Sequence, residues 1–302
     1  MSRLYNIFIS IIISLILFKF FDLKLDDFFT SIKTFHIVIL FIFSFISFFL
    51  SSLRFKYILL STNQNLKLLS SIKLTVYQNF FNAIALPGVG ELVKYYKKKK
   101  IPNIIMGASI IMEKISGFIS MAFIVFITLL YFLMNHENKK YILIFFGAIF
   151  LFLIVFRLFI KKRLFYAFPY LHFVLNTLLK VKTNNVKIYF YIFITSTLIQ
   201  LVSIALYIIL LHLNGTRDLN LFLLVMAIPT LNFVASLPIS FGGIGTRDLL
   251  GLYLFSIMGI SSIESLHTTY IIGISGILIS IIYFLITLIV SFFYSRIESK
   301  RP

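Results

Sequence analysis

The chain has 302 residues, of which 60% are hydrophobic and 13% are charged, whereas soluble globular proteins average roughly 45–50% apolar and about 25% charged residues. This composition excludes a soluble globular fold and predicts an all-α, polytopic membrane protein. The formal net charge of +18 does not predict nucleic-acid binding, because lysines between membrane spans are typical of cytoplasmic loops and no polar segment is long enough for a separate nucleic-acid module.

Six apolar stretches reach the roughly 17–25 residues that a membrane-spanning helix needs. They are Leu4–Phe21, Phe35–Leu53, Ile104–Met134, Tyr141–Ile160, Ile188–Leu213 and Thr268–Ser295. The first lacks a small-residue cleavage site, so we expect an uncleaved span rather than a signal peptide. The third is long enough that we expect a separate short helix at its start.

Two further apolar stretches contain polar residues and end at a proline followed by glycines. Ile72–Leu86 ends at Pro87 and Gly88, and Leu221–Leu237 ends at Pro238. Proline lacks an N–H group and disfavours helix in the preceding residue, so each helix should end there. We expect both segments to enter the membrane and return as re-entrant hairpins, with their turns formed by Pro87, Gly88, Gly90, Pro238, Gly242, Gly243 and Gly245.

Loop charges predict the orientation, because Lys and Arg are retained on the cytoplasmic side. Basic residues flank the first hairpin on both sides: Arg54, Lys56, Lys67, Lys73, Lys94 and Lys97–Lys100. Segment 157–187 holds seven basic residues and no acid. We therefore expect both regions and both termini to be cytoplasmic in the cell membrane, and the loops of balanced charge to lie outside.

This orientation predicts an inverted repeat within a single membrane domain that covers residues 1–302. Residues 1–134 and 137–302 each contain two spans, a hairpin and a third span, with opposite orientations in the membrane. In transporters built in this way, the broken segments lie at the substrate site near the membrane midplane. The two hairpins are therefore the predicted position of a binding site.

Charged residues lie in or beside apolar helical sequence at these hairpins: Glu91, Glu113, Lys114, Arg247 and Asp248. A charge at the bilayer centre costs about 2.5–3.5 kcal/mol on insertion scales, so such groups pair or contact a polar substrate. Glu91 is either a simple acid at a helix N-terminus or a residue of a polar cavity that contacts a lipid headgroup or Lys114.

The glycine-rich segment before Arg247 suits an anion, because helix-terminal N–H groups and glycine turns bind anions and the guanidinium fork matches phosphate. The alternative is close helix packing by the glycines, with Arg247 paired to Asp248 or Glu113. Neighbouring helical residues point about 100° apart. Glu113 and Lys114 can therefore face different partners, one Arg247 and the other Glu91.

Three motifs in order resemble the transmembrane domain of the lysylphosphatidylglycerol synthase/flippase family. They are Leu-Pro-Gly-x-Gly-Glu-Leu at 86–92, Glu-Lys at 113–114 and Leu-Pro-x-x-x-Gly-Gly-x-Gly-x-Arg-Asp at 237–248. The family more often has Glu-Arg and Arg-Glu at the last two charged pairs. The charges are the same here, but the reach of the side chains differs, which leaves the headgroup preference open.

The resemblance implies lipid translocation between leaflets. The aminoacyl-transferring members carry a large soluble domain after the membrane part, and this sequence ends at Pro302 after its last apolar stretch. Lysyl transfer is therefore not implied. We expect a flippase or scramblase for a phospholipid or polyprenyl-linked lipid, without catalytic residues, metal, cofactor or nucleic acid. The alternatives are an enzyme or partner subunit of lipid headgroup or lipid-linked sugar modification, and a non-catalytic scaffold.

Overall fold

The computed structural model describes residues 19, 34–84, 89–97, 101–135, 186–236 and 244–298. Eight helices and no strand occur in these parts of the chain, which confirms the all-helical prediction. Four helices are long and apolar enough to cross a membrane: α3 (Thr34–Ser61), α6 (Asn103–Asn135), α9 (Val186–Leu213) and α12 (Ser262–Glu298). Apart from Lys19, the predicted spans Leu4–Phe21 and Tyr141–Ile160 lie outside the described residues.

Helix α6 corrects one expectation. It runs without a break from Asn103 to Asn135, so the separate short helix predicted at its start is wrong. Pro102 precedes the helix and its carbonyl accepts from Met106 N–H at 3.0 Å, within the first turn. No proline follows inside the segment, and a helix interior tolerates the lone Gly107 and Gly117 at a modest cost.

Each interrupted apolar stretch contributes one helix of a packed pair. Helix α4 (Leu68–Ile84) packs against α5 (Val89–Lys97), and α10 (Leu221–Ala235) packs against α11 (Thr246–Ile257). Pro87, Gly88, Pro238, Gly242 and Gly243, at which we expect the two stretches to be interrupted, lie outside the described residues. The two hairpin turns therefore stay a prediction.

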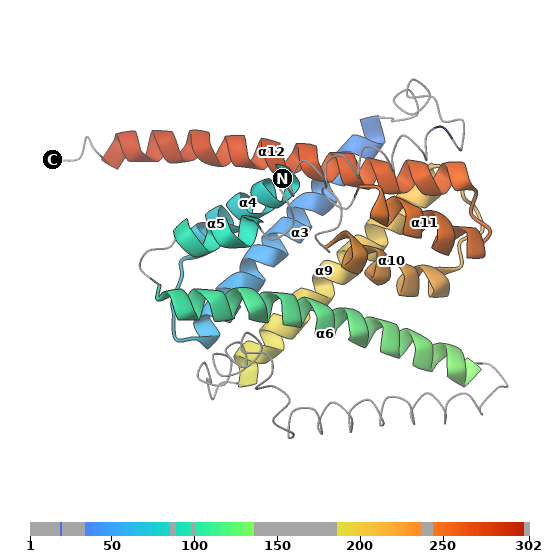
Figure 1. Ribbon diagram of the computed structural model, residues 1–302, viewed down its shortest axis with the longest axis horizontal. Coiled ribbons are helices and arrows are strands. Elements are labelled where there is room, and N and C mark those ends of the chain that lie inside the picture. The colour runs from blue at the N-terminus through green and yellow to red at the C-terminus, as the bar shows by residue number, and fades with distance from the viewer. Residues whose placement is uncertain are drawn as a thin grey trace.

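The long helices connect the two pairs. Helices α3 and α9 pack along each other, while α12 lies against α4 and α6 lies against α10 (Figure 1). Aromatic rings mark both of the latter contacts: Phe80 stacks on Phe284 with centroids 3.8 Å apart, and Phe118 lies 5.9 Å from Phe233. Within the described residues, the order of long helix, short pair and long helix thus occurs twice.

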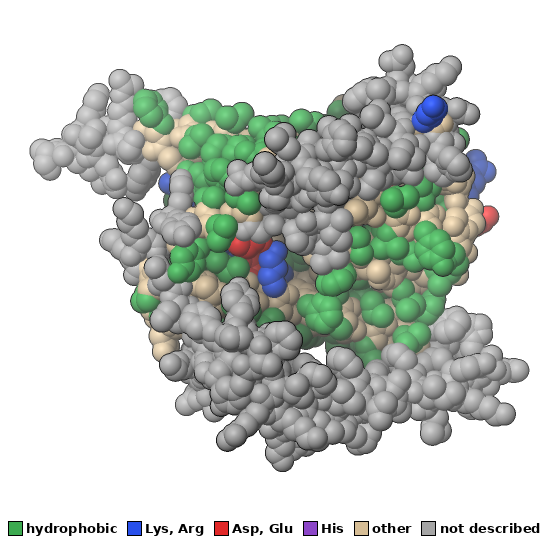
Figure 2. All heavy atoms as spheres, in the orientation of Figure 1, with side chains coloured by type: hydrophobic (Ala, Val, Ile, Leu, Met, Phe, Trp, Pro, Cys, Tyr) green, Lys and Arg blue, Asp and Glu red, His purple; other side chains and the backbone are tan. Residues whose placement is uncertain are grey.

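The outward faces of the long helices carry large apolar side chains. Phe45 is 59% exposed, Phe118 is 58% exposed and Phe292 is 62% exposed. Figure 2 shows hydrophobic side chains over much of one face, with a small group of acidic and basic side chains among them. Such a surface would be unfavourable in water and is suited to lipid acyl chains.

Candidate functional site

Gly90 brings the first helix pair into close contact. A Cβ at this position would overlap the backbone carbonyl oxygen of Gln78 on α4. The Gly90 N–H also donates to Asn82 Oδ1 at 2.8 Å, which holds the first turn of α5 against the end of α4. The expected close backbone approach at Gly90 is therefore present, and it places Glu91 directly beside α4.

Glu91 is 7% exposed and lies in the first turn of α5. Its Oε1 accepts from Lys114 Nζ on α6 at 2.6 Å and from Gln78 Nε2 at 3.2 Å. The predicted pairing of Glu91 with Lys114 is thus found in the structure. Lys114 itself has 58% of its side chain exposed, so its ammonium group can contact another anion without leaving the site.

Glu113 has different partners from those expected. Its carboxylate accepts from Lys94 Nζ at 2.9 Å and from Arg54 Nη2 at 3.2 Å, and the predicted contact with Arg247 is wrong. The reason is the direction of the side chain, since Glu113 points from α6 towards α3 and α5, while Arg247 lies on α11. One carboxylate therefore joins three helices in a buried ion-pair network.

Lys94 is fully buried. Its ammonium group donates to Gln78 Oε1 at 2.7 Å and lies 3.3 Å from the centroid of the Phe55 ring. From the sequence, Lys94 and Arg54 are expected among the charges that flank the hairpin. Both instead lie within helices and take part in the Glu113 network. The helical spacing of Lys94 from Glu91, which places both on one side of α5, could have pointed to Lys94 but not to Arg54.

The second helix pair holds Arg247 and Asp248 at the start of α11. Gly245 adopts φ +90°, a backbone conformation that favours glycine, and its N–H donates to Asp248 Oδ2 at 2.8 Å. Asp248 Oδ1 lies 3.6 Å from Arg247 Nη2. Both side chains are buried, so the alternative pairing of Arg247 with Asp248 is the one that occurs.

Arg247 reaches α12 through a space left by a glycine. Its Nη2 donates to the Thr269 carbonyl oxygen at 2.7 Å, and a Cβ on Gly273 would overlap the same nitrogen. Of the remaining polar atoms of this pair, Arg247 Nε and Asp248 Oδ1 are buried without a hydrogen-bond partner in the described structure. The guanidinium thus keeps unused donor capacity.

A pocket of about 290 Å³ lies between the ends of the two helix pairs. Its wall comes from α4, α6, α10, α11 and α12, and its polar members are Asn79, Asn82, Lys114, Ser236, Arg247 and Ser280. Of the predicted site residues, Lys114 and Arg247 line this pocket directly. Glu91 contacts Lys114 and Asp248 contacts Arg247. Glu113 lies in the adjoining ion-pair network with Lys94 and Arg54.

The arrangement suits an anion better than a metal ion. Among the described residues, no three His, Asp or Glu side chains gather as metal ligands. The described pocket wall contains two cations, two amides and two hydroxyls, all of which are groups that can donate hydrogen bonds to phosphate or carboxylate oxygens.

A family model described as "Lysylphosphatidylglycerol synthase TM region" matches residues 7–290. The chain belongs to this family. Comparisons with curated protein sequences and with solved structures gave no significant match. Membership of the lysylphosphatidylglycerol synthase transmembrane family identifies a membrane protein related to lipid modification or lipid flipping, and the apolar helices agree with a multi-pass membrane location.

Proposed function

We propose that this protein translocates a phosphate-containing or polyprenyl-linked lipid between bilayer leaflets, as a flippase or scramblase. The observation that carries the proposal is the pocket of about 290 Å³ to which both helix pairs contribute, with Lys114 and Arg247 in its wall. Two cations in one membrane-embedded pocket provide a place for a headgroup phosphate away from bulk water.

Each cation in the pocket already has an internal acidic partner. Lys114 contacts Glu91, and Arg247 contacts Asp248. A headgroup phosphate can exchange with these carboxylates, so the pocket does not leave bare buried charges when it is empty. Because the outer faces of the long helices are apolar, the acyl chains can remain in the bilayer while the headgroup moves through the pocket.

The proposed mechanism requires the two helix pairs to enter from opposite sides of the membrane. We propose that residues 1–134 and 137–302 form an inverted repeat, with both termini in the cytoplasm of the cell. The repeated element order and the exchanged contacts, α12 with α4 and α6 with α10, support this proposal. In repeats of this kind, alternating access comes from movement of one half against the other around a fixed site.

Sidedness labelling tests this topology, because the chain has no native cysteine. Lys67→Cys and Lys97→Cys should both react with a membrane-impermeant thiol reagent from the cytoplasmic side, and Arg217→Cys from the outer side. Labelling of positions 67 and 97 from different sides would contradict the re-entrant first hairpin.

The alternative of an enzyme that modifies lipid headgroups has less support from the geometry. General acid–base catalysis needs a carboxyl group that is available to the substrate. Neither Glu91 nor Glu113 lines the pocket, and the Asp248 side chain is fully buried. Lipid analysis of a deletion strain separates the two functions, because loss of a modified lipid indicates an enzyme, whereas a normal lipid in the wrong leaflet indicates transport.

Translocation in proteoliposomes tests the proposed function. A quenchable fluorescent phosphatidic acid should equilibrate between leaflets faster with the protein than without it. The variant Lys114→Gln/Arg247→Gln should lower this rate by about tenfold or more, because hydrogen bonds to charged groups contribute about 1.5–3 kcal/mol each. Lys67→Gln, at an exposed loop position, is the matched control and should retain the rate. Equal rates with and without the protein, across phosphatidic acid, anionic glycerophospholipids and polyprenyl phosphate, would contradict the proposal.

A further inference from the structure

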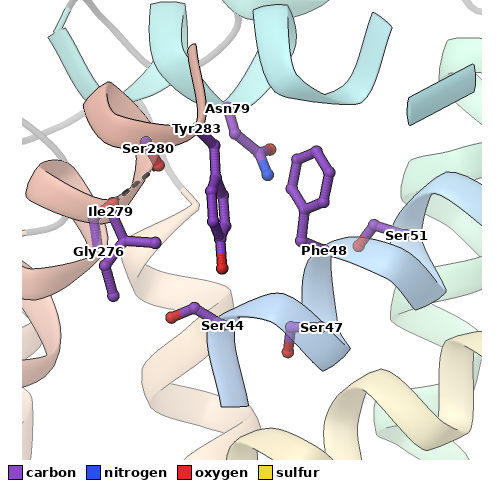
Figure 3. Close-up of a pocket in the computed structure, with 9 residues that line it drawn as sticks. All are labelled: Ser44, Ser47, Phe48, Ser51, Asn79, Gly276, Ile279, Ser280 and Tyr283. Carbon is purple, nitrogen blue, oxygen red and sulfur yellow. Dashed lines mark hydrogen bonds between the residues drawn. The ribbon is translucent and has the colours of Figure 1, made fainter. Parts of the chain in front are cut away.

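A second pocket adjoins the first. It has a volume of about 180 Å³ and lies between α3, α4 and α12 (Figure 3). Asn79, Gly276 and Ser280 line both pockets. A ligand whose phosphate lies near Lys114 and Arg247 can therefore extend into this second pocket without crossing a helix.

The chemistry of the second pocket differs from that of the first. Among the residues that the structure describes, no charged side chain lines it; its polar members are Ser44, Ser47, Ser51, Asn79, Ser280 and Tyr283. The three serines of α3 are three and four residues apart, so they lie on one face of that helix. In Figure 3, the Asn79 amide and the Tyr283 ring extend from α4 and α12 into the space beside this face.

Hydroxyl and amide groups both donate and accept hydrogen bonds. Ser280 donates to the Gly276 carbonyl oxygen at 2.7 Å and Tyr283 to that of Phe41 at 3.5 Å, and both hydroxyls can still accept. Together with Ser44, Ser47, Ser51 and the Asn79 amide, they match a ligand group that itself carries several hydroxyls. An ammonium group would need an acid or an aromatic cage. No acid from the described part of the chain lines the pocket, and Phe48 and Tyr283 contact each other, with ring centroids 5.4 Å apart.

Ser52 lies on the same helix as the pocket serines of α3 but is not part of the pocket wall. Ser52 is fully buried, and its hydroxyl donates to the Phe48 carbonyl oxygen at 2.9 Å, a local bond that commonly satisfies serine within helices. Ser52 does not line the pocket. It therefore provides a control at which a serine hydroxyl is removed from α3 without changing the pocket wall.

We propose that the second pocket binds an uncharged polyol or sugar group attached to the phosphate held by Lys114 and Arg247. This inference rests on the proposed function and narrows its substrate to lipids with hydroxyl-rich headgroups. Such a pocket would select these lipids over phosphatidic acid, which has no group to fill it, and over lipids whose headgroup ends in an ammonium.

Ligand binding tests the inference independently of transport. The thermal unfolding midpoint of the purified full chain is measured with dihexanoyl forms of phosphatidylinositol, phosphatidic acid and phosphatidylcholine. Phosphatidylinositol should raise the midpoint most. Ser44→Ala/Ser47→Ala/Ser51→Ala should reduce its effect to that of phosphatidic acid, while Ser52→Ala retains the difference.

Several outcomes of the binding measurement would overturn the inference. Equal stabilisation by phosphatidylcholine would show that the aromatic rings hold an ammonium instead. Equal stabilisation by soluble inositol 1-phosphate would make the ligand a soluble metabolite rather than a lipid. Should the triple variant fail to accumulate, Ser47→Ala alone should weaken the apparent affinity for phosphatidylinositol by about threefold, and an unchanged affinity would count against the proposal.

Translocation separates failure of this inference from failure of the proposed function. In proteoliposomes, the triple serine variant should lower the translocation rate of phosphatidylinositol by about tenfold and leave the translocation rate of phosphatidic acid unchanged. Parent protein that moves both lipids equally fast overturns the headgroup preference, while the flippase assignment stands. Parent protein that moves neither lipid, yet binds phosphatidylinositol preferentially, overturns the transport function and leaves the pocket as a binding site.

Discussion

Glu113 is the residue on which the first half of the candidate site depends most. Its carboxylate contacts Lys94, which is fully buried, and Arg54, whose side chain is 13% exposed. Two cations in a low-dielectric environment repel each other unless an acid lies between them. The carboxylate thus allows α3, α5 and α6 to meet with their charges inside the protein.

Glu113→Gln should therefore destabilise the protein by about 3–5 kcal/mol, because it leaves buried cations without a counter-charge. The measurement is the free energy of unfolding in detergent. Adding Lys94→Met should restore part of the loss, since it removes one of the unpaired cations. Asp218→Asn, at an exposed position, is the control and should change little. If Glu113→Gln alone is as stable as the parent protein, the structural role of Glu113 is contradicted.

The packing of α4 against α5 is the feature that matters most among the helices, because it positions Glu91. This packing depends on the absence of a side chain at Gly90, where the backbone of α5 lies against the Gln78 carbonyl. It also depends on the bond from the Gly90 N–H to Asn82. Any side chain at position 90 must move α5 away from α4 and carry Glu91 away from Lys114.

Gly90→Ala is expected to destabilise the protein by about 1–3 kcal/mol through overpacking, and to lower the translocation rate as well. Gly107→Ala is the matched control, because a Cβ there would meet only Tyr95 Cε2 at an ordinary 3.8 Å. Thermal unfolding midpoints of both variants give the comparison. If the Gly90 and Gly107 variants unfold at the same temperature, the close packing of α4 on α5 is not required.

At the scale of the whole molecule, the positions of the long helices could be predicted from the sequence, because they depend on local features of the chain. Long apolar runs gave α3, α6, α9 and α12, because length and apolarity alone decide whether a helix can span the bilayer. The Pro-Gly segments similarly predicted the ends of α4 and α10, whose described residues stop at Ile84 and Ala235. The pair Glu91–Lys114 was one of the alternatives expected for Glu91, because charge balance favours an acid and a base as partners.

The rest of the site depends on contacts between distant residues. Arg54 and Glu113 are 59 residues apart, and no sequence pattern shows which face of α6 meets α3. The predicted contact of Glu113 with Arg247 was wrong for this reason. The position of Ser44, Ser47 and Ser51 in a pocket wall could be recognised only from the structure, in which α4 and α12 enclose a space beside these serines.

We propose that both helix pairs contribute to one pocket through which the lipid headgroup passes. Ala83 of the first pair lines this pocket, and Ser236 follows α10 of the second pair at its wall. The most direct test introduces Ala83→Cys and Ser236→Cys into the chain, which has no native cysteine, and treats the protein in proteoliposomes with a short, reducible bifunctional thiol reagent.

Cross-linking should join positions 83 and 236 and stop lipid translocation, and reduction of the linker should restore it. The control pair, Lys67→Cys and Arg217→Cys, should not cross-link, because these positions are expected on opposite sides of the membrane. Pocket cysteines that both react singly but never cross-link, or cross-linked protein that moves lipid as fast as the untreated protein, would contradict the shared pocket.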